Sequence, residues 1–229
     1  MDIVQTILFY AASVLAIVFV LVPHEFAHAL AAHLNGDLTP KMNGRLTLNP
    51  VKHFDPVGFV MCALVGFGWA KPVPINTANF RRYKLGLFTT AIAGVVTNYL
   101  MALIFYPFYL LCIRYLGGGY GAYFLREFFR LVYSYNLSIA VFNLLPLFPL
   151  DGFRVLESLT KPWNRVRQFL QKYGQTILLV LIAESFICNI AVEYFNLDIF
   201  HYFNVLGYVM EFATYYIGMP IRALWGLII

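Results

Sequence analysis

Long runs without a charged side chain are the feature that most restricts what this chain can fold into. No Asp, Glu, Lys or Arg occurs in residues 3–23, 85–113 or 131–150. A helix needs ~20 consecutive apolar residues to cross the hydrocarbon core of a bilayer. Charged residues make up only 12% of the chain and apolar residues 61%, so a soluble fold would lack the charges to cover its surface. The sequence therefore predicts an integral membrane protein, and it excludes disordered, collagen-like and coiled-coil chains.

The order of apolar and polar segments predicts an all-α polytopic membrane protein with about five to six transmembrane helices. We expect one domain over residues 1–229, with a core of about 1–160 and C-terminal helices in 173–229. Residues 56–70 are uncharged but too short to cross a bilayer, and several glycines interrupt them, which favours a re-entrant element. Residues 45–48 alternate between polar and apolar types, which predicts a short β-like strand.

The basic residues indicate the orientation of the chain. Twelve of the sixteen Lys and Arg residues fall in segments 35–55, 71–84 and 151–172. Short loops rich in Lys and Arg stay in the cytoplasm. If segment 56–70 returns to its own side, all three loops are cytoplasmic. We therefore expect a multi-pass membrane protein, with the lipid bilayer rather than nucleic acid around it.

The segment His24-Glu25-Phe26-Ala27-His28 is an H-E-x-x-H motif on a predicted helix. Residues four apart lie on the same helix face, so His24 and His28 can bind one zinc ion together. Glu25 lies beside them and can deprotonate the water that the metal activates. Ionisable side chains inside an apolar helix are costly, which favours a functional role for all three.

A third protein ligand is needed, because catalytic zinc has three protein ligands and an open position for water. Asp151 is the best candidate, since it follows an uncharged span and the two helix-breaking prolines of N-L-L-P-L-F-P-L-D-G. We expect it near the cytoplasmic membrane face, at the depth of His28. Glu157 is the first alternative to test. The sequence gives no role for Glu184, Glu193 or Glu211.

At these two motifs the sequence resembles the site-2 protease family, the intramembrane zinc metalloproteases (peptidase family M50). The segments H-E-F-A-H-A, N-L-L-P-L-F-P-L-D-G and, at 66–76, G-F-G-W-A-K-P-V-P-I-N carry the resemblance, which covers about residues 1–160. In the middle helix Gly94 and Asn98 match a G-P-x-x-N motif, but the proline is absent. The length fits a small member without PDZ or CBS domains.

The resemblance implies a single integral-membrane metalloprotease domain that cleaves peptide bonds in or near transmembrane segments of other membrane proteins. It implies one zinc ion per chain, an active site toward the cytoplasmic side, and a re-entrant or β-like element near that site. The implied metal ligands are His24, His28 and Asp151, with Glu25 as the general base and Asn143 as a catalytic residue that stabilises the oxyanion.

Two other functions use the same residues. A membrane transporter also places His, Glu and Asp in its helices, although it usually spreads them over several helices and often contains repeats, which this chain lacks. A scaffold without proteolytic activity would lose one of the four key residues, and all four are present. The sequence determines neither the natural substrate nor the oligomeric state.

Overall fold

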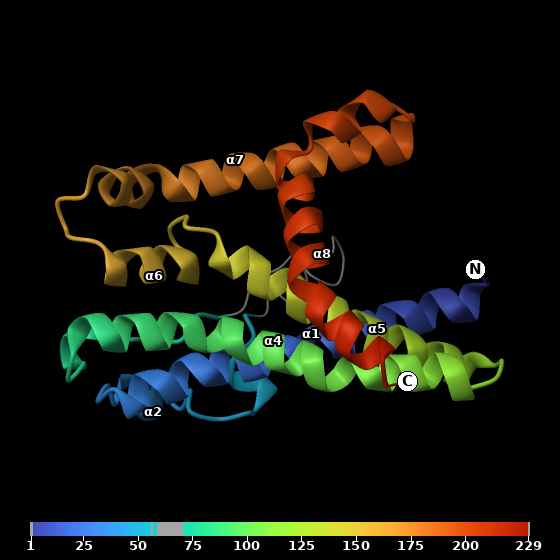
Figure 1. The fold of residues 1–229 in the computed structure, drawn as a ribbon, viewed down its shortest axis with the longest axis horizontal. Coiled ribbons are helices and arrows are strands. Elements are labelled where there is room, and N and C mark those ends of the chain that lie inside the picture. Colours follow the sequence, from blue (N-terminus) through green and yellow to red (C-terminus); the bar gives the residue numbers. More distant parts are fainter. Residues whose placement is uncertain (1, 56, 59–70, 229) are drawn as a thin grey trace.

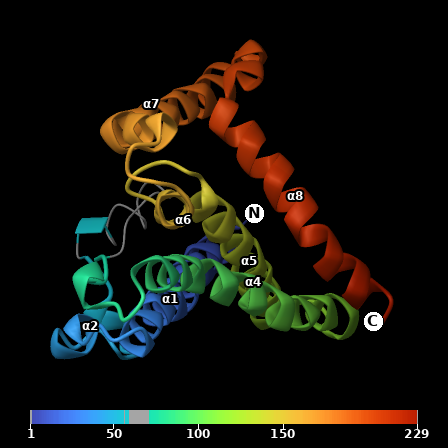
Figure 2. The same ribbon diagram turned by 60° about the vertical axis from the view of Figure 1, so that its left-hand side comes forward.

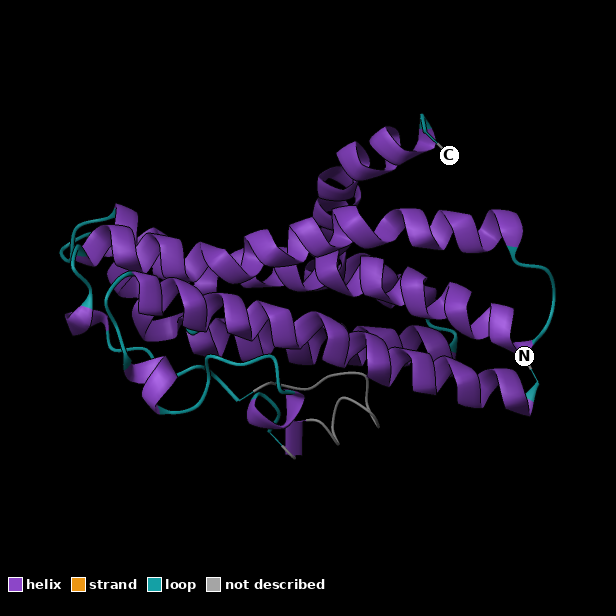
Figure 3. Ribbon diagram, turned by 90° about the horizontal axis from the view of Figure 1, so that it is seen from below, coloured by secondary structure: helices purple, strands orange, loops and turns teal. Residues whose placement is uncertain are grey.

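The structure, a computed structural model, describes residues 2–55, 57–58 and 71–228, and the regular elements in these ranges are helices (Figures 1 and 3). The α-helices are α1 (Ile3–Leu34), α2 (Thr39–Met42), α4 (Tyr83–Tyr115), α5 (Tyr120–Leu144), α6 (Asp151–Leu159), α7 (Arg165–Phe195) and α8 (Val205–Gly226). Short 3-10 helices lie at η1 (Pro50–Lys52), η2 (Thr77–Asn79) and η3 (Asp198–Phe203). The predicted all-α architecture is confirmed.

Helices α1, α4 and α5 pack side by side as a three-helix bundle (Figures 1 and 2). Ala12 and Ala16 of α1 are fully buried against Leu131 and Val132 of α5, and Ala102 of α4 is buried against Tyr133 and Leu137 of the same helix. Small residues at these positions let the helix backbones approach closely, which is how helices pack in a membrane.

Three of the described helices are long and apolar enough to cross a membrane, namely α1, α4 and α7. Helix α5 begins at Tyr120, earlier than the uncharged run predicts, and so includes Arg126, Glu127 and Arg130. Three apolar helices in a single chain agree with a multi-pass integral membrane protein. The number of crossings stays a prediction.

The end of α1 and the end of α5 follow from the sequence. α1 stops at Asn35, whose backbone N–H caps the last carbonyls of the helix. α5 stops at Leu144, because Pro146 cannot continue a helix and restricts the residue before it. The chain then turns and starts α6 at Asp151 (Figure 1).

Two predictions about the polar segments are wrong. Residues 45–48 are not a strand. Hydrogen bonds between side chains and backbone carbonyls, rather than pairing with a neighbouring strand, hold this segment. The buried Arg45 guanidinium donates to the carbonyls of Lys52 and Pro72, and the ring Nε2 of His53 bonds the Thr47 carbonyl oxygen at 2.7 Å. The basic segment 151–172 is not a loop throughout, since it contains α6 and the start of α7. The predicted re-entrant element at 56–70 lies outside the described residues except for 57–58.

Candidate metal centre

The two histidines of the H-E-x-x-H motif lie on one buried face of α1. His24 is 3% exposed and His28 is 6% exposed. Their Nε2 atoms are 3.0 Å apart, and the ring planes are nearly perpendicular. Such proximity of two ring nitrogens agrees with the face that the four-residue spacing predicts.

Asp151 reaches the same point from the first turn of α6. Its Oδ2 lies 3.0 Å from Nε2 of His28 and 3.6 Å from Nε2 of His24. The glycine after it makes this position possible, because a Cβ on Gly152 would lie 2.2 Å from the carbonyl oxygen of Leu144. Only a residue without a side chain lets α6 fold back onto the end of α5 so closely.

Helix α4 fixes the orientation of the His28 ring. The Nδ1–H of His28 donates to the backbone carbonyl oxygen of Thr90 at 2.7 Å. This bond puts the ring proton on Nδ1 and leaves the Nε2 lone pair facing His24 and Asp151. Histidines that bind metals are held in this way, with the second ring nitrogen bonded to a carbonyl or carboxylate.

Gly94 of α4 packs directly against the two imidazoles. A Cβ at this position would lie 2.5 Å from Nε2 of His28 and 2.5 Å from Cε1 of His24. Real Cβ atoms do not approach other atoms so closely, so any side chain here displaces the rings. The glycine that the sequence shares with the G-P-x-x-N motif therefore has a packing role.

This donor set suits zinc. One nitrogen of His24, one nitrogen of His28 and one oxygen of Asp151 all lie within 4.8 Å of one another. Two imidazoles and one carboxylate form a common ligand set of catalytic zinc, and three protein ligands leave one position open. The two rings are buried, and Gly94 has no side chain that would displace them, so the residues fit the metal in chemistry.

The other two predicted site residues, Glu25 and Asn143, are not among these three candidate ligands. Glu25 follows His24 on α1 and is partly exposed. Asn143 lies in the last turn of α5, where its side-chain amide donates to the Ile139 carbonyl oxygen at 3.1 Å. Their catalytic roles stay predictions.

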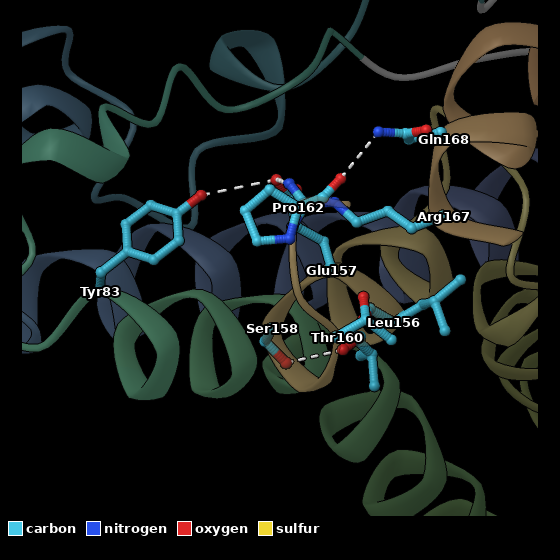
Figure 4. A network of polar contacts seen from close by, with 9 residues as sticks. Tyr83, Leu156, Glu157, Ser158, Thr160, Pro162, Arg167 and Gln168 are labelled. Carbon is cyan, nitrogen blue, oxygen red and sulfur yellow. Dashed lines mark hydrogen bonds and ion pairs between the residues drawn. The ribbon is translucent and has the colours of Figure 1, made fainter. Parts of the chain in front are cut away.

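The alternative ligand Glu157 takes part in a different set of contacts (Figure 4). Its Oε1 accepts a hydrogen bond from Nη2 of Arg167 on α7 at 2.5 Å, and the hydroxyl of Tyr83 on α4 lies 3.5 Å from the same oxygen. This carboxylate therefore joins α6, which carries Asp151, to both neighbouring helices. It is not in the metal-competent cluster of the described residues.

Asp37 holds the polar segments next to the site, a role that the sequence does not reveal. Its buried carboxylate accepts hydrogen bonds from the backbone and hydroxyl of Thr39, from the backbone N–H of Asn76 at 2.8 Å and from the amide of Asn79 at 2.8 Å. Burial raises the pKa of Asp37, but these hydrogen bonds outweigh it and hold that pKa below its usual value. In the sequence this residue looks like an ordinary solvated loop charge.

Comparisons with known proteins agree with this geometry. The family model described as peptidase family M50 matches residues 118–183, which include α6 and Asp151. The Bacillus subtilis (strain 168) protein named "Putative zinc metalloprotease YwhC" is 41% identical over 168 residues, which cover 70% of this chain and 74% of that protein. No solved structure matches the chain. Given the identity, the coverage and the motif residues brought together here, the chain belongs to peptidase family M50, the site-2 protease family, and is a zinc metalloprotease.

Proposed function

We propose that this protein is an intramembrane metalloendopeptidase that hydrolyses peptide bonds in or near transmembrane segments of other membrane proteins. One zinc ion per chain is held by His24, His28 and Asp151. The observation that carries this proposal is the convergence of three donor atoms, two of them buried on a helix that is apolar enough to cross a membrane. A site at that position meets substrates that lie in the bilayer.

The residues around the site have separate tasks in the proposed reaction. When bound, zinc supplies a Lewis acid that acidifies water and polarises a peptide carbonyl. The Glu25 carboxylate accepts a proton from the attacking water and passes it to the leaving nitrogen. The amide of Asn143 donates to the oxygen on which negative charge develops. The carbonyl of Thr90 keeps the His28 ring in the tautomer whose Nε2 is free.

The substrate must reach these groups as an extended chain. A transmembrane helix engages each backbone carbonyl in an i to i−4 hydrogen bond, so its peptide bonds are inaccessible. A membrane protein with one locally unwound transmembrane helix is therefore the expected substrate class.

The proposed topology has five to six crossings, a re-entrant segment at 56–70, and cytoplasmic segments 35–55, 71–84 and 151–172 in a bacterial cell membrane. It is supported by the position of the C-terminal end of α1, the N-terminal ends of α4 and α7 and the whole of α6, which lie at one end of the molecule (Figure 1). Single cysteines at the exposed Met42, Ala78 and Lys161 should all react with an impermeant maleimide from the cytoplasmic side only. Labelling of position 78 from the outside contradicts this topology.

A cleavage assay tests the proposed activity. The purified full chain, loaded with zinc, is incubated with a reporter that carries a single transmembrane helix. The Glu25→Gln variant should lose cleavage by ~10²–10⁴-fold, because an amide cannot accept the proton. It should keep its zinc, while Glu211→Gln on the exposed face of α8 keeps full activity.

The same experiment separates the rival functions. A scaffold gives no cleavage with the unmodified chain. A transporter carries zinc into liposomes that contain the protein, with no cleavage of the reporter. Full activity of Glu25→Gln contradicts the mechanism, and loss of zinc from this variant makes Glu25 a ligand rather than the base.

A further inference from the structure

Two buried polar groups on the α1–α4 interface have no hydrogen-bond partner among the described residues. One is Nδ1 of His24, whose ring is almost wholly buried. The other is the side-chain amide of Asn98, which is fully buried and has neither its oxygen nor its nitrogen bonded. An unpaired amide in an apolar interior costs several kcal/mol, and a membrane supplies no bulk water to satisfy it.

The packing of α1 against α4 places His24 and Asn98 at neighbouring positions along the helix axes. Thr90 bonds the His28 ring, and a Cβ at Gly94 would lie 2.7 Å from Nδ1 of His24. Thr90, Gly94 and Asn98 are four residues apart, so they share one face of α4. Asn98 therefore follows Gly94 on the face that contacts α1, about 6 Å further along the helix axis.

The direction of the Asn98 side chain closes most of this distance. The Cα–Cβ bonds of a helix tilt toward its N-terminus, so the side chain of Asn98 leans back over the turn of Gly94. Gly94 has no side chain there to block it. One water molecule with two hydrogen bonds of ~2.8 Å each can join two polar groups that face each other in this way.

We propose that Asn98 is the outer hydrogen-bond partner of His24, through one water molecule buried between the amide and Nδ1. This water accepts the Nδ1–H of His24 and donates to Oδ1 of Asn98. It gives partners to two of the unpaired groups at once, as buried waters do. This inference rests on the proposed zinc site.

The consequence for the metal centre is symmetrical support of both histidines. The Nδ1–H of His28 is held by the Thr90 carbonyl, and the Nδ1–H of His24 is held by Asn98. Each ring then presents Nε2, the atom that faces its partner ring at 3.0 Å. Asn98 is a positioning residue, because it acts on the metal only through His24.

The test measures zinc affinity by competition with a chromogenic chelator at constant pH, on the purified full chain. Asn98→Leu should weaken zinc binding ~10–100-fold, the usual effect of losing an outer partner of a ligand. The control is Asn136→Leu, because Asn136 on α5 is also fully buried with an unpaired Oδ1. This control should bind zinc as the unmodified chain does. The visible spectrum of the Co²⁺-loaded protein should shift in Asn98→Leu and not in Asn136→Leu.

Each outcome decides one question. If the unmodified chain binds no zinc, the proposed function fails, whatever Asn98 does. If it binds zinc and Asn98→Leu binds equally well, or if both asparagine variants weaken binding alike, the role of Asn98 is overturned. If Asn98→Leu does not fold, Asn98→Ser and Asn98→Ala replace it. The serine hydroxyl can still accept a hydrogen bond from the water and should retain more affinity than alanine, which has no polar atom; equal losses overturn the inference.

Discussion

Helices α4 and α7 are similar in length and apolar character but differ in how the chain buries them. Ten of the 33 residues of α4 are buried within the molecule, against four of the 31 residues of α7. Helix α4 lies inside the bundle with α1 and α5, whereas α7 and α8 extend away from it (Figure 2). Helix α1, which carries His24 and His28, is therefore held by packing against α4 and α5, whereas the apolar surface of α7 is left for the bilayer to cover.

The contacts of α7 lie at its two ends. Gly174 and Leu178 are buried toward the end near α6, and Cys188 and Ala191 toward the end near η3. At that second end the Glu184 carboxylate accepts a hydrogen bond from the first backbone N–H of α8 at 3.2 Å. This contact gives a structural role to one of the carboxylates that the sequence leaves unassigned.

Helix α8 returns to the bundle only near its C-terminal end. Ile221 is 1% exposed against α4 and α5, Trp225 donates to the Leu103 carbonyl oxygen at 2.9 Å, and Arg222 donates to the Tyr133 hydroxyl at 3.2 Å. Changes beside the candidate ligands should affect metal binding strongly, and changes in α7 and α8 should affect it weakly.

The largest difference in zinc affinity is expected between substitutions of two aspartates, Asp151 and Asp198. Asp151→Ala removes a proposed ligand and should lower zinc affinity by more than ~100-fold, beyond the effect of losing an outer partner. Asp198→Ala, in η3, should leave the affinity unchanged. Chelator competition measures both. Unchanged affinity in Asp151→Ala means that another residue is the third ligand.

A single added methyl group in the bundle is expected to have the next largest effect. Gly94→Ala forces a carbon into the space of the two imidazoles, so it should weaken zinc binding at least tenfold and cost about 1–3 kcal/mol of stability. The control is Gly121→Ala in α5, where nothing lies within 4 Å of the added carbon. Metal analysis and thermal unfolding report the two effects. Similar behaviour of both variants contradicts the packing role of Gly94.

The sequence predicts those site residues whose pattern lies within a short stretch of the chain, and it misses those whose role depends on contacts with distant segments. His24 and His28 follow from helix geometry alone, and Asp151 follows from ligand chemistry and the prolines before it. The carbonyl of Thr90 could not be predicted, because every residue has a carbonyl. Helix α6 was missed because its nine residues are short, amphipathic and placed in a basic segment that looks like a loop. Asp37 was missed because its partners come from another segment of the chain.

The Asp37 contacts predict how the polar end of the bundle responds to acid. A carboxylate whose pKa is lowered in the folded state stabilises it above the unfolded pKa, near 3.8, and this stability is lost as the pH falls through the lower, folded value. Asp37→Asn should cost about 2 kcal/mol at pH 7, the scale of a hydrogen bond to a charged group. The variant should also lose less stability between pH 5 and about 3 than the unmodified chain. Thermal unfolding over this pH range measures both, and parallel curves contradict the assignment.

The smallest effect on stability is expected for the ion pair that joins α7 to α6. Arg167→Ala leaves Glu157 without its ion-pair partner and should lower stability by about 1 kcal/mol, since the pair is only partly buried. Arg165→Ala removes a nearby exposed charge and should change stability by less than about 0.5 kcal/mol. Thermal unfolding compares the two variants. A loss of zinc in Arg167→Ala would show that the pair also positions Asp151.

The proposed ligands lie on α1 and α6, so they are made at different times during synthesis of the chain. The ribosome delivers His24 and His28 first, then the α4 residues that surround the rings, and Asp151 only after α5. An unfinished chain in the membrane thus carries two imidazoles and no carboxylate to complete the set. The free energy of zinc binding at such a site adds to the free energy of folding. Zinc therefore stabilises only chains that have been inserted through α6. With these three proposed ligands, we therefore expect tight zinc binding only after α6 has been made.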